Sequence, residues 1–170
     1  MTPFRKLTSA ETAALEALGN SAEDWTKVTV APDFEPGQLR QSHLEGRVEI
    51  ARGARIVRSR VAGYRIGEES LVEGVTALEC RRRSAFGNGT GVATMNECGG
   101  RTVKIFDTMS AQVAYVMAVY RHRPALVAAL DRMARRAADA ARSAQGSIGR
   151  DCRITDCRLL RDVCIGHGAT

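Results

Sequence analysis

Aliphatic residues recur along this chain at steps of five or six positions from about residue 46 onward, and several of them precede a glycine. This period fits neither an α-helix nor a strand with one buried face. A repeat of about six residues is typical of a parallel β-helix, in which each hexad forms one short strand with its aliphatic side chain pointing inward. We expect the five-residue steps to be absorbed at corners between strands. The series comprises Ile50, Ile56, Val61, Ile66, Val72 and Leu78, and then Ile148, Ile154, Leu160 and Ile165.

Two further stretches carry helical patterns. Thr8 and Glu11 have the spacing of a capping box ahead of apolar residues, which predicts a short helix over about 9–18. Residues 108–142 have a helical composition, and Pro124 predicts a break between two helices because proline cannot donate a helix hydrogen bond. The second helix has one apolar stripe, so it should pack on the solenoid, on the first helix or on another subunit. The stripe consists of Leu126, Leu130, Met133, Ala137 and Ala140.

These patterns divide the chain into four expected regions. Residues 1–45 form an N-terminal helical or irregular cap, 46–106 a first β-helix block, 107–145 a helical insertion and 146–170 a resumed but truncated β-helix. The expected fold class is therefore mainly β, a parallel β-helix solenoid interrupted by a helical hairpin. Because solenoid turns bury their apolar ends only against neighbouring turns, we expect so short a solenoid to be inactive by itself.

Composition narrows the functional classes. Of the 25 basic residues, 3 are lysine and 22 are arginine, scattered among 19 acidic residues, and aromatic residues make up only 5% of the chain. Neither a basic tract nor a stacking platform for nucleic acid is present. No apolar run approaches the roughly 20 residues of a membrane span, and the first residues lack the apolar run of a secretory signal. We therefore expect a cytoplasmic protein that binds neither nucleic acid nor membranes.

The five cysteines form no CxxC pair. Their spacing fits neither a disulfide framework nor a zinc site, so we expect free thiols and no metal.

Several strings of residues resemble the domain-of-unknown-function 4954 family of long hexapeptide-repeat proteins, over nearly the whole chain. Family members are much longer, so the chain looks like an N-terminal fragment that stops inside a coil at Thr170. The stretch from about Gly46 to Tyr64 also looks shorter than in the family. The strings are Phe86-Gly87-Asn88-Gly89, Asn96-Glu97, Gly99-Gly100-Arg101, Ile105-Phe106-Asp107, Ser110-Ala111-Gln112-Val113-Ala114-Tyr115 and, most distinctively, Tyr120-Arg121-His122-Arg123-Pro124-Ala125-Leu126, together with Leu7-Thr8, Ala22-Glu23-Asp24-Trp25 and Ser147-Ile148-Gly149.

The resemblance implies membership of the trimeric LpxA-like superfamily of left-handed parallel β-helices. Many of these proteins are acyltransferases that act on nucleotide-linked sugars or other small acceptors and take the acyl group from a thioester. From this resemblance we expect a small-molecule substrate, an acyl-coenzyme A donor and a homo-oligomer of three subunits. The family name itself records no activity.

An acyltransferase of this kind needs a base to deprotonate its acceptor, and His122 is the best candidate. Arg121 and Arg123 flank it at the expected helix break, where their cations could hold a phosphate while the imidazole accepts a proton. The alternative is structural, with His122 bonding local carbonyl groups at the end of its helix. His167 falls at a predicted hexad corner, where side chains are usually solvated.

A second polar group lies where the chain leaves the predicted solenoid. Glu97 is a candidate base or ligand for an acceptor amine, Asn96 helps to shape the acceptor pocket, and Arg101 is a candidate phosphate ligand. A structural network that anchors the insertion explains the same residues equally well. Asn88 has a structural reason of its own, because asparagine tolerates the left-handed conformation of a tight corner.

Two functions therefore remain open. The first is an acyl or related group transferase that acts on a nucleotide-sugar-like small molecule. The second is a non-catalytic scaffold or ligand-sensing module whose helical insertion mediates oligomerisation. A transferase should place an imidazole in a cleft with basic neighbours, whereas a scaffold should leave these side chains dispersed. The expected catalytic residues are His122 and Glu97, and the expected substrate-binding residues are Asn96, Arg101, Arg121 and Arg123.

Overall fold

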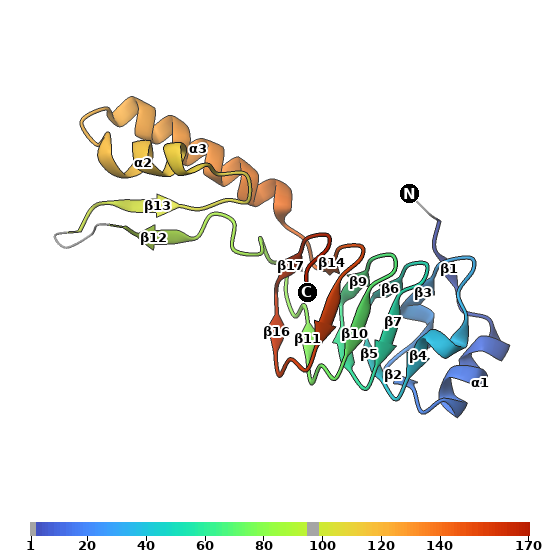
Figure 1. The fold of residues 1–170 in the computed structure, drawn as a ribbon. Helices are drawn as coiled ribbons and strands as arrows, with labels where there is room; N and C mark the ends of the chain where they lie inside the picture. The colour runs from blue at the N-terminus through green and yellow to red at the C-terminus, as the bar shows by residue number, and fades with distance from the viewer. Residues whose placement is uncertain (1–2, 95–98) are drawn as a thin grey trace. The chain divides into compact units, whose positions relative to one another are not determined.

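The computed structural model describes residues 3–94 and 99–170, and these residues are mainly β, with parallel sheets and three α-helices (Figure 1). The described strands form no closed barrel. The helices are α1 (Ser9–Ala17), α2 (Ala111–Val119) and α3 (Pro124–Ala141), with 3-10 turns η1 (Trp25–Lys27) and η2 (Pro36–Gln38). The strands are β1 (Arg5–Lys6), β2 (Ser21–Ala22), β3 (Val28–Val30), β4 (Leu39–Arg40), β5 (His43–Glu45), β6 (Val48–Ile50), β7 (Arg55–Val57), β8 (Arg60–Ala62), β9 (Tyr64–Ile66), β10 (Leu71–Glu73), β11 (Leu78–Glu79), β12 (Gly91–Ala93), β13 (Thr102–Lys104), β14 (Gly146–Ile148), β15 (Arg153–Thr155), β16 (Leu160–Arg161) and β17 (Cys164–Ile165).

The chain divides into two compact units. The first unit comprises the residues up to Arg83 together with Ala144–Thr170, and it holds the parallel strand pairs. The second unit is Ser84–Ser143, and besides α2 and α3 it includes the antiparallel pair of β12 and β13. Reciprocal backbone hydrogen bonds of 2.8 and 3.0 Å join the two ends of the second unit, at Ser84 and Ser143. No helix in the described ranges is both long enough and apolar enough to span a membrane.

Successive strands of the first unit visit three sheets in rotation (Figure 1). Sheet A has the order β1-β3-β6-β9-β14-β17, sheet B β16-β11-β8-β5-β2 and sheet C β15-β10-β7-β4. Leu39, Ile56 and Val72 are in register on consecutive strands of sheet C, so one turn takes 16 or 17 residues. After the second unit the ladders resume, because Ile148 pairs with Ile66 and the strand after it continues sheet C.

The aliphatic series predicted from the sequence lines the interior of the first unit, as expected. Its members in the first block are fully buried, and register stacks each of them on the corresponding residue of the next turn. Burying one such side chain contributes about 1.5–3 kcal/mol, so these columns are the main source of stability. The fully buried members are Ile50, Ile56, Val61, Ile66, Val72 and Leu78; Ile148 and Ile154 are also buried.

Left-handed backbone marks the corners between the sheets. Gln41 (φ 48°) and Arg58 (φ 45°) occupy equivalent corners between sheets C and B in two consecutive turns. Positive φ is uncommon for such residues, so the turn geometry imposes this conformation rather than the residue type. The other corner residues with positive φ are Gly74 and Asp156 between sheets C and B, Gly46, Gly63 and Asp162 between sheets B and A, and Gly53, Glu69 and Asp151 between sheets A and C.

Buried side-chain oxygens support the corner that leads into sheet B. The Ser42 N–H donates to Asn20 Oδ1 at 3.1 Å, the Ser59 N–H to Ser42 Oγ at 3.2 Å, and the Val75 N–H to Ser59 Oγ at 3.0 Å. Each turn is thus bonded to the preceding one through a buried polar atom. These side-chain oxygens accept hydrogen bonds from backbone N–H groups that have no partner in the strand pairing.

Helix α1 covers the interior at the first turn of the ladders. Its capping box is present as predicted, because the Thr8 hydroxyl accepts from the Glu11 N–H and the Glu11 carboxylate accepts from the Thr8 N–H. Leu15, on its buried face, is 0% exposed and belongs to the same core as the aliphatic columns. The helix therefore shields apolar side chains that strands alone would leave open.

Tyr64 is the largest fully buried side chain, and it fills the space above a glycine. Gly146 is its register partner, and a Cβ atom there would lie 2.3 Å from the Tyr64 ring. The ring passes Gly146 and reaches the next turn, where its hydroxyl donates to Val163 O at 2.8 Å and accepts from Val163 N at 3.1 Å. Burial raises the pKa of the Tyr64 phenol to about 12.

We expect Tyr64→Phe to lower the free energy of unfolding by about 1–2 kcal/mol, because both Val163 hydrogen bonds are lost. The phenol ionises near pH 10 in the unfolded chain but only near pH 12 in the folded one, so the stability it contributes is complete below pH 10 and declines towards pH 12. Urea unfolding at several pH values should show the wild-type advantage shrinking across this window. A constant advantage would contradict the assignment.

In the second unit α2 packs on β13 and on α3, and β12 pairs with β13 (Figure 1). The helix break at Pro124 is confirmed, since α3 begins at that residue. The buried face of α3 differs from the predicted stripe: Ala134 and Ala138 are buried, whereas Leu126 and Met133 are each 40% exposed. The reason is that α3 lies close to the segment around Gly89, because a Cβ atom at Gly89 would be only 3.0 Å from the Ala138 Cβ. That contact selects small side chains for the buried face.

Candidate functional site

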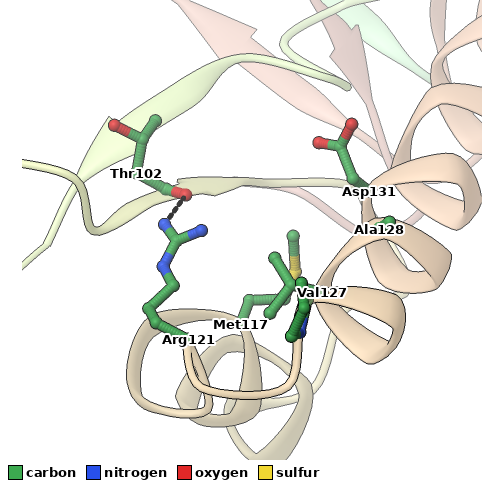
Figure 2. A pocket seen from close by; sticks show the side chains of 7 residues that line it. Thr102, Met117, Arg121, Val127, Ala128 and Asp131 are labelled. Atoms are coloured by element: carbon green, nitrogen blue, oxygen red, sulfur yellow. Dashed lines mark hydrogen bonds between the residues drawn. The ribbon is translucent and has the colours of Figure 1, made fainter.

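The second unit contains a pocket of about 340 Å³ between α2, β13 and α3. Figure 2 shows Arg121, in the turn after α2, reaching towards Thr102 on β13, while Asp131 lies across the pocket on α3. The volume is within the range of about 300–1,000 Å³ that small-molecule sites occupy. The remaining lining residues are Met117, Pro124, Val127 and Ala128.

Apolar side chains form the floor of this pocket. Met117 is 3% exposed and packs with Val103 and Ala118 in a small core of its own. This core holds α2 on β13, and Pro124 then starts α3 so that Val127 and Ala128 line the same pocket. The floor is therefore preformed by packing, and only the rim carries charge.

Arg121 is held at the rim by one hydrogen bond. Its Nη2 atom donates to Thr102 O at 3.0 Å, and the side chain is otherwise exposed. A guanidinium group has five N–H donors, so this bond orients the group and leaves donors for a ligand. Planar guanidinium groups bind phosphate and carboxylate oxygens in pairs, and the free donors of Arg121 have the chemistry for such a contact.

Asp131 does not oppose that role, because two cations already bind it. Lys104 Nζ lies 2.7 Å from Asp131 Oδ1, and Arg135 Nη2 lies 2.6 Å from Asp131 Oδ2. The hydrogen bond from Lys104, reinforced by Arg135, holds the pKa of the Asp131 carboxyl below its usual range. The charged residues that line the pocket are Arg121 and Asp131, and the Asp131 carboxylate is already paired with Lys104 and Arg135, which do not line it.

His122 lies next to Arg121 but contacts an aromatic ring. Its imidazole stacks at a tilt on Tyr120, with ring centroids 5.6 Å apart, and the residue is exposed. Arg123 is the N-cap residue of α3 and is also exposed. The structure thus brings Arg121 to the pocket and places His122 and Arg123 in the turn beside it.

The second predicted group is only partly visible. Asn96 and Glu97 lie outside the described residues, and Arg101 directly precedes β13, where its carbonyl accepts hydrogen bonds from Thr94. Asn88 is buried, but its φ is not positive; the left-handed residues of this turn are Phe86, Gly87 and Gly89. Asn88 instead bonds Asp107 through both its amide nitrogen and its amide oxygen.

Three charged residues were not among those predicted: Asp131 lines the pocket, and Lys104 and Arg135 bind its carboxylate. Asp131 and Arg135 are four residues apart on α3, a spacing that signals a helical ion pair. Lys104 carries no such signal, because only the packing of β13 against the helices brings it to Asp131. The net charge around the pocket therefore depends on tertiary structure.

Comparisons with known proteins give a family but no activity. The family described as "Domain of unknown function (DUF4954)" matches residues 53–170. An uncharacterized protein of Treponema pallidum (strain Nichols) is 25% identical over 207 residues, which cover 98% of this chain and 29% of that protein. The chain thus spans less than a third of the length of this relative. No solved structure matches the chain.

Proposed function

The chain belongs to the family described as domain of unknown function DUF4954, and we propose that it is a hexapeptide-repeat protein whose second unit binds an anionic small molecule for acyl or related group transfer. The observation that carries this proposal is the Arg121 guanidinium at the rim of an apolar pocket whose lining carboxylate, Asp131, is already paired with two cations. A nucleotide-linked sugar combines a phosphate group for that cation with less polar surface for the floor.

For the first unit we propose a left-handed parallel β-helix of the trimeric LpxA-like superfamily. Support comes from the rotation of strands among three sheets, with 16 or 17 residues per turn and one inward aliphatic residue per strand. Proteins of this superfamily commonly act as trimers, and a homo-oligomer of three subunits is part of the proposal.

The proposed reaction uses His122 as its base. The acceptor hydroxyl or amine attacks the thioester carbonyl of an acyl-coenzyme A, and its proton passes to the imidazole. The carbon–sulfur bond then breaks, and the same proton neutralises the leaving thiolate. Arg121 holds the acceptor phosphate, and Arg123 lies two residues further along the same turn.

We expect Arg121→Gln to weaken binding of uridine diphosphate glucose by about 10- to 100-fold, because a charge-assisted hydrogen bond contributes about 1.5–3 kcal/mol. Isothermal titration calorimetry on the full chain measures this directly. The matched control is Arg136→Gln, which removes the same charge from an exposed position on α3 that does not line the pocket. Equal losses in both variants would mean that general charge attraction, not the pocket, holds the ligand.

The scaffold function is the second candidate, and exposed apolar side chains favour it. Tyr115 on α2 is 58% exposed, and Leu126 and Met133 on α3 are each 40% exposed. Such residues suit an oligomer contact. If the folded chain binds neither uridine diphosphate glucose nor acetyl-coenzyme A in the same titrations, the ligand proposal fails and this second function takes its place.

A further inference from the structure

Ser21, His43 and Glu45 form a hydrogen-bonded relay in the first unit. Ser21 Oγ lies 2.8 Å from His43 Nδ1, and His43 Nε2 lies 3.0 Å from Glu45 Oε1. Ser21 and His43 are register partners on β2 and β5. Leu44 is buried between His43 and Glu45, so these two side chains project from the outer face of sheet B. A hydroxyl, an imidazole and a carboxylate linked in this order activate a serine for nucleophilic attack.

The charge on Glu45 sets the protonation pattern of the relay. Arg60 binds both Glu45 oxygens at 2.7 Å, and this pairing holds the pKa of the Glu45 carboxyl below its usual range. An ionised carboxylate only accepts hydrogen bonds, so the neutral His43 ring carries its proton on Nε2. His43 Nδ1 is then the acceptor for the Ser21 hydroxyl, which is the arrangement a general base requires.

The relay is accessible from solvent and has a backbone donor beside it. Ser21 is exposed, and the His43 side chain is 41% exposed. The N–H groups of Ser21 and Glu23 donate to carbonyls of the neighbouring chain segment, so the Ala22 N–H between them points the other way. Because β2 is the edge strand of sheet B, that N–H points away from β5, on the residue that follows the nucleophile. A donor at this place can stabilise an oxyanion.

We propose that Ser21, His43 and Glu45 form an esterase site for small carboxylic esters, separate from the ligand pocket of the second unit. An adjoining pocket of about 430 Å³ shares Glu45 with the relay. Small residues, among them Ala62, Gly63 and Cys80, line it together with the charged residues Glu23, Arg47 and Arg81. This pocket gives room for a short acyl or alcohol group. A flat sheet face offers no deep acyl tunnel, so short-chain esters are the expected class.

The reaction balances with water as the second reactant. Ser21 Oγ attacks the ester carbonyl, and its proton moves to His43 Nδ1 while the oxyanion forms near the Ala22 N–H. The carbon–oxygen bond of the ester breaks, and the leaving alkoxide takes the proton from His43. Water, deprotonated by His43, then attacks the acyl-serine. The bond between the acyl carbon and Ser21 Oγ breaks, Ser21 Oγ takes the proton back from His43, and the carboxylic acid leaves.

The test is covalent labelling of the full chain with a fluorophosphonate, which forms an oxygen–phosphorus bond with an activated serine and releases fluoride. Peptide mass spectrometry should place the label on Ser21, and Ser21→Ala should remove it. His43→Gln should slow labelling by about 100-fold, within the contribution expected of a positioned general base. Hydrolysis of p-nitrophenyl acetate, followed by absorbance, should fall in parallel.

Controls separate this activity from general surface reactivity. Ser147→Ala and His167→Gln change the same residue types on other parts of the first unit and should leave the labelling rate unchanged. Glu45→Gln keeps the shape of its side chain and should slow labelling by about 10-fold, which provides a second variant if His43→Gln does not fold. Absence of label on Ser21 in a folded sample, or a labelling rate that neither His43→Gln nor Glu45→Gln lowers, overturns the proposal.

Discussion

Replacing Gly67 by alanine should lower the free energy of unfolding by about 3 kcal/mol, the upper part of the range for overpacking. A Cβ atom at this position would lie 2.3 Å from the carbonyl oxygen of Gly149 and 2.7 Å from the Arg150 nitrogen. These are backbone atoms of the next turn, so no side-chain rotation can relieve the clash. The two turns would have to separate, which weakens the ladder between β9 and β14.

Gly166→Ala is the matched control, and urea unfolding followed by circular dichroism is the measurement. Gly67 and Gly166 each follow an inward isoleucine of sheet A, so they occupy equivalent places in different turns. A Cβ atom at Gly166 would meet nothing within 4 Å, and we expect a change within about 0.5 kcal/mol. Equal effects at both glycines would show that backbone flexibility, rather than close contact between turns, determines the result.

Ile56→Ala should lower the free energy of unfolding by about 3–4 kcal/mol. Ile56 is 0% exposed and stacks between Leu39 and Val72 in sheet C. Truncation removes its transfer free energy and leaves a cavity, and backbone pairing on both sides limits how far the neighbouring strands can close it. Buried isoleucine-to-alanine changes cost about 2–5 kcal/mol, and a site that cannot collapse falls in the upper half.

Chemical denaturation with a surface control measures this effect. Leu159→Ala removes a similar apolar side chain from a position that is 48% exposed, so we expect its effect to remain within about 0.5 kcal/mol. The slope of unfolding free energy against denaturant should be unchanged in Ile56→Ala, since the same surface is exposed on unfolding. A loss below about 1 kcal/mol would mean that the interior rearranges to fill the space.

The interior of the first unit was predictable because one strong signal determines it. Only aliphatic side chains fit the columns, so their spacing along the chain reports the turns directly, and all six predicted members of the first block are buried. The corners were not predictable at Gln41, Arg58 and Glu69, which carry no glycine or asparagine signal for a left-handed backbone. There the neighbouring strands, rather than the local residue, select the conformation.

The packed face of α3 was only partly predictable from its hydrophobic pattern. Hydrophobicity alone favours Leu126 and Met133 as the packed residues, yet close contact with the segment around Gly89 selects Ala134 and Ala138. Space between backbones is a tertiary quantity, and no periodicity along one helix records it. The pattern therefore located this helix correctly and placed Leu130 on its packed face, but it included the exposed Leu126 and Met133 and missed Ala134 and Ala138.

The residues of the candidate sites also differ in whether local sequence or only tertiary structure identifies them. Arg121 was predictable from local sequence, because a cation beside a helix break is visible in the chain. Its counterpart Asp131 and the lysine that binds it come from different elements. Ser21 and His43 are 22 positions apart, and only the parallel register of β2 and β5 brings them together.

The reciprocal backbone hydrogen bonds between Ser84 and Ser143 hold the two ends of the second unit together, as in an inserted segment whose ends lie side by side. Once both ends are fastened, doubling the length between them adds only about 0.6 kcal/mol of closure entropy. Selection can therefore lengthen, shorten or replace the segment between Ser84 and Ser143 while the strands before and after it keep their pairing. Changes inside the second unit would then accumulate faster than changes in the parallel strand pairs of the first unit.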